Sequence, residues 1–464
     1  MSKYYKSFTL LILLVFVLAA CGGPDTSTGF VEGGSDFHTP TEAPTEAPTE
    51  PAVPMAAGVE LAALDGVEVE FWHVWDRAVG DSLQAIVDGF NASNEYGISV
   101  VALDQGSYGD IRDAVNAGIN TGDIPDITVG YPSDYRPWES AAGIVVDQNP
   151  NISDEMVGMT DDDIADYFET FWVQDVFGDE RLGLPAQRSG NMIFYNVSWA
   201  QELGFDSAPT TPAEFKEQAC ASSAANGDGT GGWFIDSGAS SLAGWIFAFG
   251  GEFETADGYD FTSQAAQDTL GFFASMSAEG CAWKPEARFP NPEFATRLGL
   301  FFQSSIAGLP FQKGAFEAAG NTDEWTSLAF PSVDGNPVLT VYGPSLVILE
   351  STPEEQLASW IFARYFTEAQ NQADWIAVSG YFPTRIGTAS LLDDFAAENP
   401  QWGAARDAMS NTKFEPRFES YGAVRGAMGD AFSQIFADGF DLATVGDVLA
   451  ALQATEYEIH AETQ

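Results

Sequence analysis

Three short loops of the sequence combine an aromatic ring with a hydrogen-bonding side chain. These pairs are Trp75 with Asp76, Ser107 with Tyr108, and Tyr131 with Asp134. Aromatic rings stack on the C–H faces of a sugar, while carboxylates and hydroxyls form hydrogen bonds with its hydroxyl groups. A few polar groups in a mostly aromatic cleft are typical of small-molecule sites. The three loops therefore indicate a site for a small polar solute, with core packing as the alternative for each single aromatic ring.

Three predicted strands position these loops. Alternating apolar and polar residues predict the first strand over 67–72, GISVVAL predicts the second over 97–103, and DITVG predicts the third over 126–130. Amphipathic segments between them predict helices, and the first helix has an apolar face at helical spacing, formed by Leu83, Ile86, Val87 and Phe90. Alternating strands and helices imply a parallel sheet. The loops after its strands then meet at one edge, where α/β proteins bind ligands. Trp72 lies on the first strand itself and is assigned to the core.

Two later helices have clear amino-terminal signals. Thr211 and Thr352 are each followed by proline and, three residues on, by Glu214 and Glu355 respectively. This combination predicts a capping box with proline in the first helical turn.

Histidine usage excludes several catalytic classes. Of the three histidines, His38 and His460 lie near the chain ends, which leaves His73 alone in the folded part. One histidine is too few for a histidine-based zinc site, and a Ser-His-Asp triad is not predicted either. The sequence also has no P-loop, no GxGxxG after a strand and no EF-hand loop. No catalytic residue, metal or cofactor is predicted, although a carboxylate pair for glycoside hydrolysis stays open because its geometry is spatial.

The amino terminus carries an export signal. Lys3 and Lys6 precede an apolar run from Phe8 to Ala20, which is shorter than the about 20 residues that span a bilayer. Residues 1–20 are therefore predicted to be a signal peptide. Its end, LAAC, resembles the bacterial lipobox, which implies that Cys21 is lipidated and becomes the amino terminus. An ordinary signal peptide with an incidental cysteine is the alternative.

Composition divides the rest of the chain. Residues 21–58 are rich in Gly, Ser, Thr, Pro and acidic residues, and are predicted to form a disordered spacer. The rest of the chain has more residues than a single hydrophobic core usually stabilises, so two lobes are expected. The chain has 68 acidic and 18 basic residues, and this charge opposes nucleic acid and anionic lipid as partners.

Cys220 and Cys281 each lie near the end of a predicted helix. An exported compartment permits them to pair, so a disulfide is expected. Two separate buried thiols are the alternative.

The order of motifs after about residue 66 resembles the family 1 extracellular solute-binding proteins of ABC importers, which include maltose-, other sugar- and glycerol-phosphate-binding proteins. The motifs are EFWHVW, FNASN, ISVVALDQGSY, GDIPDITVG, GLPAQRSGNMIFYN, LGFDSAPTTPAEF and YGPSLVILE followed by ARYFTEAQNQADWIAVSGYFPTR. The resemblance implies an α/β periplasmic-binding-protein-like fold with two hinged lobes, each a mainly parallel sheet flanked by helices. The first lobe would hold 59–188 and 340–380, and the second 189–339 and 381–464. The chain would cross between them near Arg188, Leu339 and Gly380.

The resemblance also implies further binding residues, besides the three loops. These are Phe311, Gln312 and Lys313 in GLPFQKG, the wall residue Tyr421, the hinge-proximal Tyr342 and Gly343, the clamp Arg385, and the weaker candidates Trp233 and Trp245.

The implied function is capture of a carbohydrate-like solute in the cleft between the lobes and its delivery to an ABC permease. The protein would be a monomer and not an enzyme, anchored outside the cytoplasm by its lipid. One alternative is a phosphorylated polyol such as glycerol 3-phosphate, bound with the help of Arg188 and Arg385. The others are an extracellular sugar-acting enzyme and a sensor.

Overall fold

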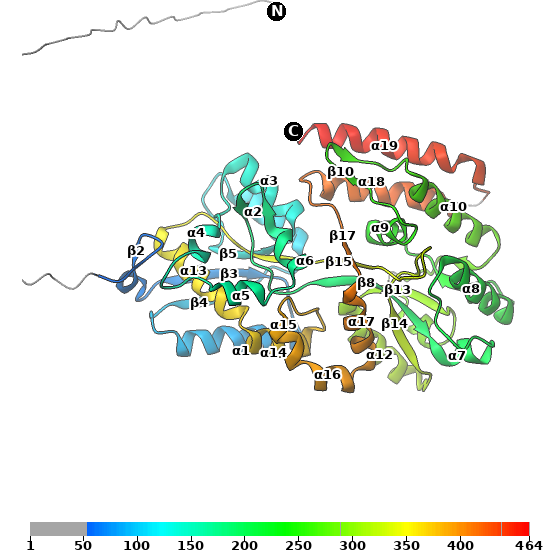
Figure 1. The fold of residues 1–464 in the computed structure, drawn as a ribbon, viewed down its shortest axis with the longest axis horizontal. Helices are drawn as coiled ribbons and strands as arrows, with labels where there is room; N and C mark the ends of the chain where they lie inside the picture. Colours follow the sequence, from blue (N-terminus) through cyan, green and yellow to red (C-terminus); the bar gives the residue numbers. More distant parts are fainter. Residues whose placement is uncertain (1–52, 288, 438, 464) are drawn as a thin grey trace, which may run out of the picture. The chain divides into compact units, whose positions relative to one another are not determined.

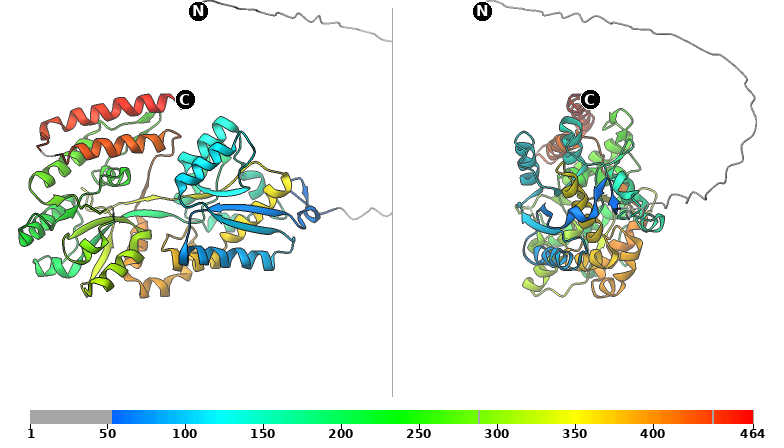
Figure 2. Two further views of the ribbon diagram at one scale, coloured as in Figure 1. Left: turned by 180° about the vertical axis from the view of Figure 1, so that it is seen from behind. Right: turned by 90° about the vertical axis from the view of Figure 1, so that its left-hand side faces the viewer.

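The computed structural model describes residues 53–287, 289–437 and 439–463. They belong to one compact unit, built around two large β-sheets with helices on their faces (Figures 1 and 2). The predicted signal peptide, Cys21 and most of the predicted spacer lie outside the described residues. Within the described ranges, no helix has the length and apolar character needed to cross a membrane.

Regular structure begins before the predicted end of the spacer at residue 58. Strand β1 (Met55–Ala56) pairs antiparallel with β2 (Val59–Glu60). The side chain of Ala56 is buried, and the backbone amide of Ala57 donates a hydrogen bond to Asp154 Oδ2 at 2.7 Å. The last few spacer residues therefore belong to the folded part, because Ala56 packs on its core and Asp154 holds the amide of Ala57.

The smaller sheet contains the three predicted strands. Its four strands have the order β16-β5-β3-β4. Their bounds are β3 (Glu68–His73), β4 (Ser99–Asp104), β5 (Ile127–Gly130) and β16 (Ser345–Ile348). β3 runs parallel to β4 and β5, whereas β16 runs antiparallel to β5. A strand from far along the chain thus completes the predicted parallel core of this sheet.

Helices cover both faces of the smaller sheet. They include α1 (Arg77–Ser93), α2 (Tyr108–Gly118), α3 (Pro132–Ala142), α13 (Pro353–Phe366) and α14 (Ala369–Ser379). Figures 1 and 2 show α2 and α3 over one face, with α1 and α14 over the other. The predicted apolar face of α1 is buried, and the predicted capping box at Thr352 is present. We call this sheet and its helices the first lobe.

The larger sheet has seven strands in the order β12-β9-β13-β8-β15-β17, with β14 paired to β8. Their bounds are β8 (Ser189–Asn196), β9 (Trp233–Phe234), β12 (Ala282–Trp283), β13 (Phe301–Ser305), β14 (Trp325–Leu328), β15 (Leu339–Tyr342) and β17 (Thr412–Phe414). β8 is buried along its whole length and runs antiparallel to β13, β14 and β15. The pairs β9–β12, β9–β13 and β15–β17 are parallel.

The larger sheet has its own set of helices, and together we call them the second lobe. They are α7 (Val197–Glu202), α8 (Pro212–Asn226), α9 (Ala239–Ala248), α10 (Gln264–Ala278), α11 (Asn291–Ala295), α12 (Leu309–Ala319), α17 (Pro400–Asp407), α18 (Tyr421–Gln434) and α19 (Val445–Ala461). The capping box predicted at Thr211 is present at the start of α8. Figure 1 shows α18 and α19 side by side at the carboxyl end of the chain.

Short elements complete the fold. They are α4 (Asn149–Ile152), α5 (Asp161–Ala165), α6 (Glu169–Trp172), α15 (Ile386–Leu391), α16 (Asp393–Glu398), and the hairpins β6 (Val176–Phe177) with β7 (Glu180–Arg181) and β10 (Glu254–Thr255) with β11 (Gly258–Tyr259).

Strand pairing shows where the chain passes from one sheet to the other. It enters the larger sheet at Ser189, next to the crossing that the family resemblance implies near Arg188. It returns at Gly343 and Pro344, after β15, a few residues later than the expected crossing at Leu339, because β15 pairs with β8 and β17. Beyond Gly380, the hydroxyl of Thr384 still donates to the Pro185 carbonyl of the first lobe at 2.8 Å. The full lobe boundaries stay a prediction.

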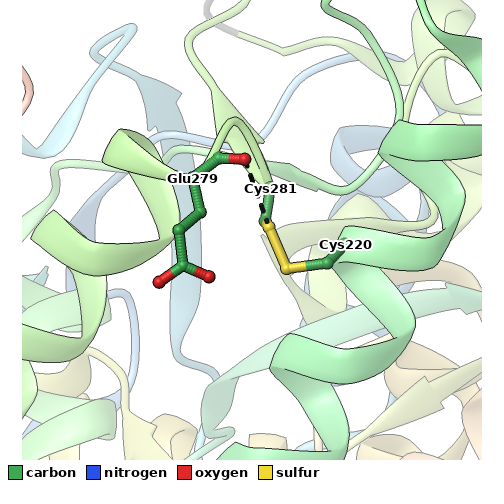
Figure 3. A group of neighbouring side chains, drawn as sticks. All are labelled: Cys220, Glu279 and Cys281. Carbon is green, nitrogen blue, oxygen red and sulfur yellow. Dashed lines mark hydrogen bonds between the residues drawn. A yellow bond between two sulfur atoms is a disulfide. The ribbon is translucent and has the colours of Figure 1, made fainter.

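Cys220 and Cys281 form the expected disulfide (Figure 3). The bond joins α8 to the segment between α10 and β12, on the outer part of the second lobe. It closes a loop with a sequence separation of 61 residues. In the chain-entropy model, such a loop contributes about 4 kcal/mol to stability.

Candidate ligand-binding cavity

A cavity of about 360 Å³ lies between the two lobes, and both contribute to its walls. We call it the main cavity. The first lobe supplies the start of α2, the loop from β5 into α3, and Gln174. The second lobe supplies the end of β15, the segment 414–417, the start of α18, and Ser240. The lining residues are Tyr108, Arg112, Tyr131, Pro132, Ser133, Asp134, Gln174, Ser240, Val341, Tyr342, Gly343, Phe414, Glu415, Pro416, Arg417, Tyr421, Gly422 and Arg425.

The sheet topology explains why the second and third predicted loops meet there. β4 and β5 both run parallel to β3, so their carboxyl ends lie at the same edge of the sheet. Helix α2 begins with Tyr108 after β4, and α3 begins directly after Tyr131. The Tyr131 amide donates to Asp134 Oδ2 at 3.1 Å, which caps α3 and fixes this loop.

Four tyrosines and Phe414 supply the aromatic rings of the main cavity. The rings of Tyr108 and Tyr131 meet edge to face, with centroids 5.1 Å apart. Burial raises the pKa of both phenols well above the usual value, and the neighbouring Tyr381 adds to the effect. Burial and then the Glu415 carboxylate raise the pKa of Tyr342 and Tyr421. All four hydroxyls are therefore neutral at physiological pH and able to donate a hydrogen bond.

The arginines of the main cavity all have partners. Arg425 forms an ion pair with Glu415, and its Nη2 donates to Ser240 Oγ at 3.0 Å. Burial opposes the charge of Arg425, but the Glu415 carboxylate together with Tyr421 and Tyr342 outweighs it, and the guanidinium pKa is raised. Arg112 Nη1 lies 3.8 Å from Asp134 Oδ1. Guanidinium and carboxylate groups side by side offer donors and acceptors to hydroxyl groups without leaving a net charge for an ion to neutralise.

The two lobes also touch at one side of the main cavity. Arg136 Nη2 lies 3.4 Å from Glu419 Oε1, and Ser140 Oγ donates to Glu419 Oε2 at 2.9 Å. Arg417 Nη1 donates to the Val173 carbonyl at 2.8 Å. Both guanidinium groups lie over the ring of Phe177. The guanidinium carbon of Arg136 is 4.7 Å from the ring centroid, and that of Arg417 is 5.5 Å from it. We call these interactions the edge contact, since they join α3 and residues 173–177 of the first lobe to residues 417–419 of the second.

Several residues predicted to bind ligand line the main cavity. They are Tyr108, Tyr131, Asp134, Tyr342, Gly343 and Tyr421. Gly343 has a φ of 159°, and a Cβ added there would lie 3.1 Å from Arg188 Cα. The close approach of these two backbone segments explains the glycine. The part that each residue plays in binding stays a prediction.

The first predicted loop does not reach the main cavity. Trp75 is 6% exposed and packs edge-on against Trp375 at 4.7 Å in the core of the first lobe. Asp76 is exposed at the start of α1 and pairs with Arg77 at 3.4 Å. Trp72, assigned to the core from its strand position, is only half-buried and donates through Nε1 to Glu70. Trp72 therefore packs at the margin of the core as assigned, whereas Trp75 also enters the core, because the loop after β3 turns back into it.

Ser107 and His73 have local structural contacts. The hydroxyl of Ser107 accepts from the Asp110 amide at 3.2 Å and caps α2. His73 Nδ1 accepts from the Trp75 amide at 3.2 Å, and burial lowers the imidazole pKa.

Five of the second-lobe candidates also lie outside the main cavity. Trp233 and Trp245 are fully buried in the core of the second lobe, 6.2 Å apart. Phe311 and Lys313 are exposed on α12, whereas Gln312 is buried beneath them and donates to the Asn291 carbonyl at 3.1 Å. The stretch GLPFQKG thus forms a peripheral helix and no part of the wall.

Both arginines considered for an anionic ligand are structural. Arg385 Nε lies 2.7 Å from Asp166 Oδ2, and a backbone bridge joins Arg385 to Tyr167. Arg188 is fully buried with its Nη2 2.9 Å from Asp175 Oδ2. These ion pairs stabilise the segments that connect the lobes and leave neither charge for a solute.

Four charged residues of the main cavity were not predicted from the sequence, namely Arg112, Glu415, Arg417 and Arg425. Arg425 could have been predicted, since it follows the predicted wall residue Tyr421 at the i, i+4 spacing that places both on one helix face. Glu415 and Arg417 lie in an irregular segment after β17, and only the tertiary fold brings that segment to the cavity.

Comparisons with known proteins agree with this architecture. Residues 85–404 match the model of a family described as bacterial extracellular solute-binding protein. No curated protein matches the chain. Among solved structures, the sugar-binding protein MalE from Xanthomonas citri is similar with a TM-score of 0.73 at 19% identity, covering 85% of this chain and 98% of that one.

Two further structures have the same fold. The cyclic alpha-maltosyl-1,6-maltose binding protein from Arthrobacter globiformis has a TM-score of 0.69 at 22% identity, covering 85% of this chain and 98% of that one. UgpB from Mycobacterium tuberculosis, solved with glycerophosphocholine, has a TM-score of 0.68 at 19% identity, covering 84% and 98%. The two-lobed periplasmic-binding-protein-like fold is as predicted, and the chain belongs to the bacterial extracellular solute-binding protein family.

Proposed function

We propose that this chain is a lipid-anchored binding protein outside the cytoplasm that captures a neutral carbohydrate-like solute in the main cavity and delivers it to an ABC permease. The observation that carries the proposal is a tyrosine-lined cavity whose arginines are already paired. Arg112 and Arg425 face Asp134 and Glu415, and Arg417 lies close enough to the Glu254 carboxylate to offset part of the rise that burial causes in the pKa of that group. Hydroxyl groups can bond to such pairs, whereas a phosphate needs an uncompensated positive charge.

This reasoning favours a neutral sugar over a phosphorylated polyol. One of the similar structures holds glycerophosphocholine, while two others are named as sugar-binding proteins. The formal net charge of −50 also repels anions at a distance. A solute that touches both lobes stabilises the closed arrangement, and binding by this mechanism requires no chemical step.

A ligand screen tests the proposal. In a thermal-shift assay of residues 53–464, neutral oligosaccharides at about 100 times Kd are expected to add about 2.7 kcal/mol, or about 3 °C. Glycerol 3-phosphate and glycerophosphocholine are expected to produce no shift. A shift with the phosphate compounds alone would refute the choice of a neutral ligand, and turnover of the bound sugar on long incubation would show an enzyme.

The edge contact is expected to stabilise the closed arrangement. Replacing Arg136 and Glu419 together by alanine should weaken binding of every ligand by the same factor, about fivefold, because a partly buried ion pair contributes about 1 kcal/mol. Isothermal titration calorimetry with two sugars of different length measures the factor. The exchange Arg136→Glu with Glu419→Arg is the control and should recover much of the affinity. A loss confined to one sugar would mean that these residues touch the ligand.

The lipid anchor can be tested in the full-length chain. Cys21→Ser is expected to move the protein from the membrane fraction to the soluble extracytoplasmic fraction, since a chain without acyl groups has no membrane affinity. Cell fractionation and the mass of the mature amino-terminal peptide report the result. Retention of the variant in the membrane would contradict the lipobox assignment.

A further inference from the structure

A second cavity adjoins the main cavity on the side of the second lobe. It has a volume of about 540 Å³ and shares Ser240, Tyr342 and Arg425 with the main cavity. We call it the flanking cavity. Its other walls come from β8, from the segment after β9, from residues 284–287 and 289–290, and from β13. It therefore belongs wholly to the second lobe.

Buried polar side chains with fixed partners line the flanking cavity. Gln303 is 3% exposed, and its Nε2 donates to Ser241 Oγ at 2.9 Å. Trp245 Nε1 approaches Gln303 Oε1 at 3.4 Å from the core side. Asp236 accepts from the Gly238 amide at 2.9 Å and from the Ser241 hydroxyl. Such a network holds polar groups in place before a ligand arrives, which lowers the entropy cost of binding.

An aromatic ring stands at the rim of the flanking cavity. Phe289 is 64% exposed, although large apolar side chains are usually buried. Phe234 and Phe302 also line the cavity and are buried. On the same rim, Lys284 and Glu286 are exposed and carry opposite charges. Aromatic rings beside hydrogen-bonding groups also form the main cavity, although its rings are partly or fully buried.

Arg425 connects the two cavities. Its Nη1 pairs with Glu415, which lines the main cavity, while its Nη2 donates to Ser240, which lines both. Polar surface therefore runs from one cavity into the other. The main cavity is near the lower end of the range of ligand pockets, about 300–1,000 Å³, and the two together are near the upper end.

We propose that the flanking cavity binds the second part of an extended solute, so that the protein selects oligosaccharides that pass across Arg425 from the main cavity. The proposal rests on the proposed function and adds ligand length to it. One end of the sugar chain lies among the tyrosines between the lobes. The following units lie on the second lobe, with Phe289 against a sugar face.

The test compares ligand length in the wild-type protein and in two matched variants. Calorimetric titrations use gluco-oligosaccharides of two to five units, in both the maltose and the cellobiose series. Phe289→Ala removes the rim ring, and Phe311→Ala removes an equally exposed ring, 63% exposed on α12, that lines neither cavity. Affinity is expected to rise with length in the wild type. Phe289→Ala should lose about tenfold for the longest bound sugar and little for the shortest, whereas Phe311→Ala should bind like the wild type.

The outcomes separate the two proposals. Sugar binding with equal affinity at every length, unchanged by Phe289→Ala, would overturn the flanking cavity as a subsite and leave the proposed function standing. An equal loss for all lengths in Phe289→Ala would also overturn it. Binding of no sugar in either series would overturn both proposals. Melting temperatures of the two variants check that each is folded, and because both rings are exposed, neither substitution should change stability appreciably.

Discussion

Arg425→Leu is expected to weaken solute binding by about a hundredfold and to lower the free energy of unfolding by about 2 kcal/mol. Arg425 is the charged residue among the three that line both cavities, so its loss removes charge-assisted hydrogen bonds to the proposed solute. It also leaves the Glu415 carboxylate, whose side chain is 7% exposed, without its partner. Removing one member of a fully buried pair costs about 3–5 kcal/mol, and the 38% exposure of Arg425 reduces that cost here.

A double variant separates the two effects. Arg425→Leu combined with Glu415→Leu should recover most of the lost stability, because no unpaired charge stays buried, but it should not recover binding. Arg406→Leu is the matched control, since Arg406 also forms an ion pair in the second lobe, with Asp393 at 2.8 Å, and lines neither cavity. Urea unfolding and calorimetry measure the two quantities. Normal affinity in Arg425→Leu would show that the solute binds elsewhere.

Trp75→Ala is expected to lower the free energy of unfolding by about 3–5 kcal/mol and to leave the dissociation constant of the folded protein unchanged. The ring is 6% exposed and packs against Trp375, so its removal creates a void in the core of the first lobe. Because Trp75 does not line the main cavity, the solute loses no contact. Chemical denaturation gives the stability, and titration at low temperature gives the affinity.

Tyr131→Ala is the counterpart to Trp75→Ala. Its ring is half-buried at the main cavity, so binding should fall at least tenfold while stability changes less than in Trp75→Ala. The opposite result, with binding lost in Trp75→Ala and retained in Tyr131→Ala, would show that the first predicted loop belongs to the binding site.

Much of the fold could be read from local sequence patterns. The buried face of α1 and the capping boxes at Thr211 and Thr352 depend on residues within one or two helical turns, and all are present. The end of β15 was harder to place, because a strand belongs to the sheet that its partners occupy, and those partners are β8 and β17.

The site was less predictable than the fold. Tyr108, Tyr131 and Asp134 could be found because parallel strands bring their carboxyl ends to one edge. Phe311 and Arg385 were expected at the site from a family resemblance, yet one is exposed on a peripheral helix and the other is held by Asp166. A motif that aligns in order along the chain does not determine where a side chain points.

The sequence by itself determined the periodicity and capping of the helices and the parallel direction of the three predicted strands of the first lobe, because these depend on short-range patterns; it also led to the expected pairing of Cys220 with Cys281, because other cysteines are scarce. Only the tertiary structure decided which aromatic rings reach the cavity and which enter the core. It also brought Glu415, Arg417 and Arg425 to tyrosines of the first lobe far away in the sequence. Ring orientation and charge pairing depend on contacts between segments that are distant in the sequence, and no short sequence pattern predicts such contacts.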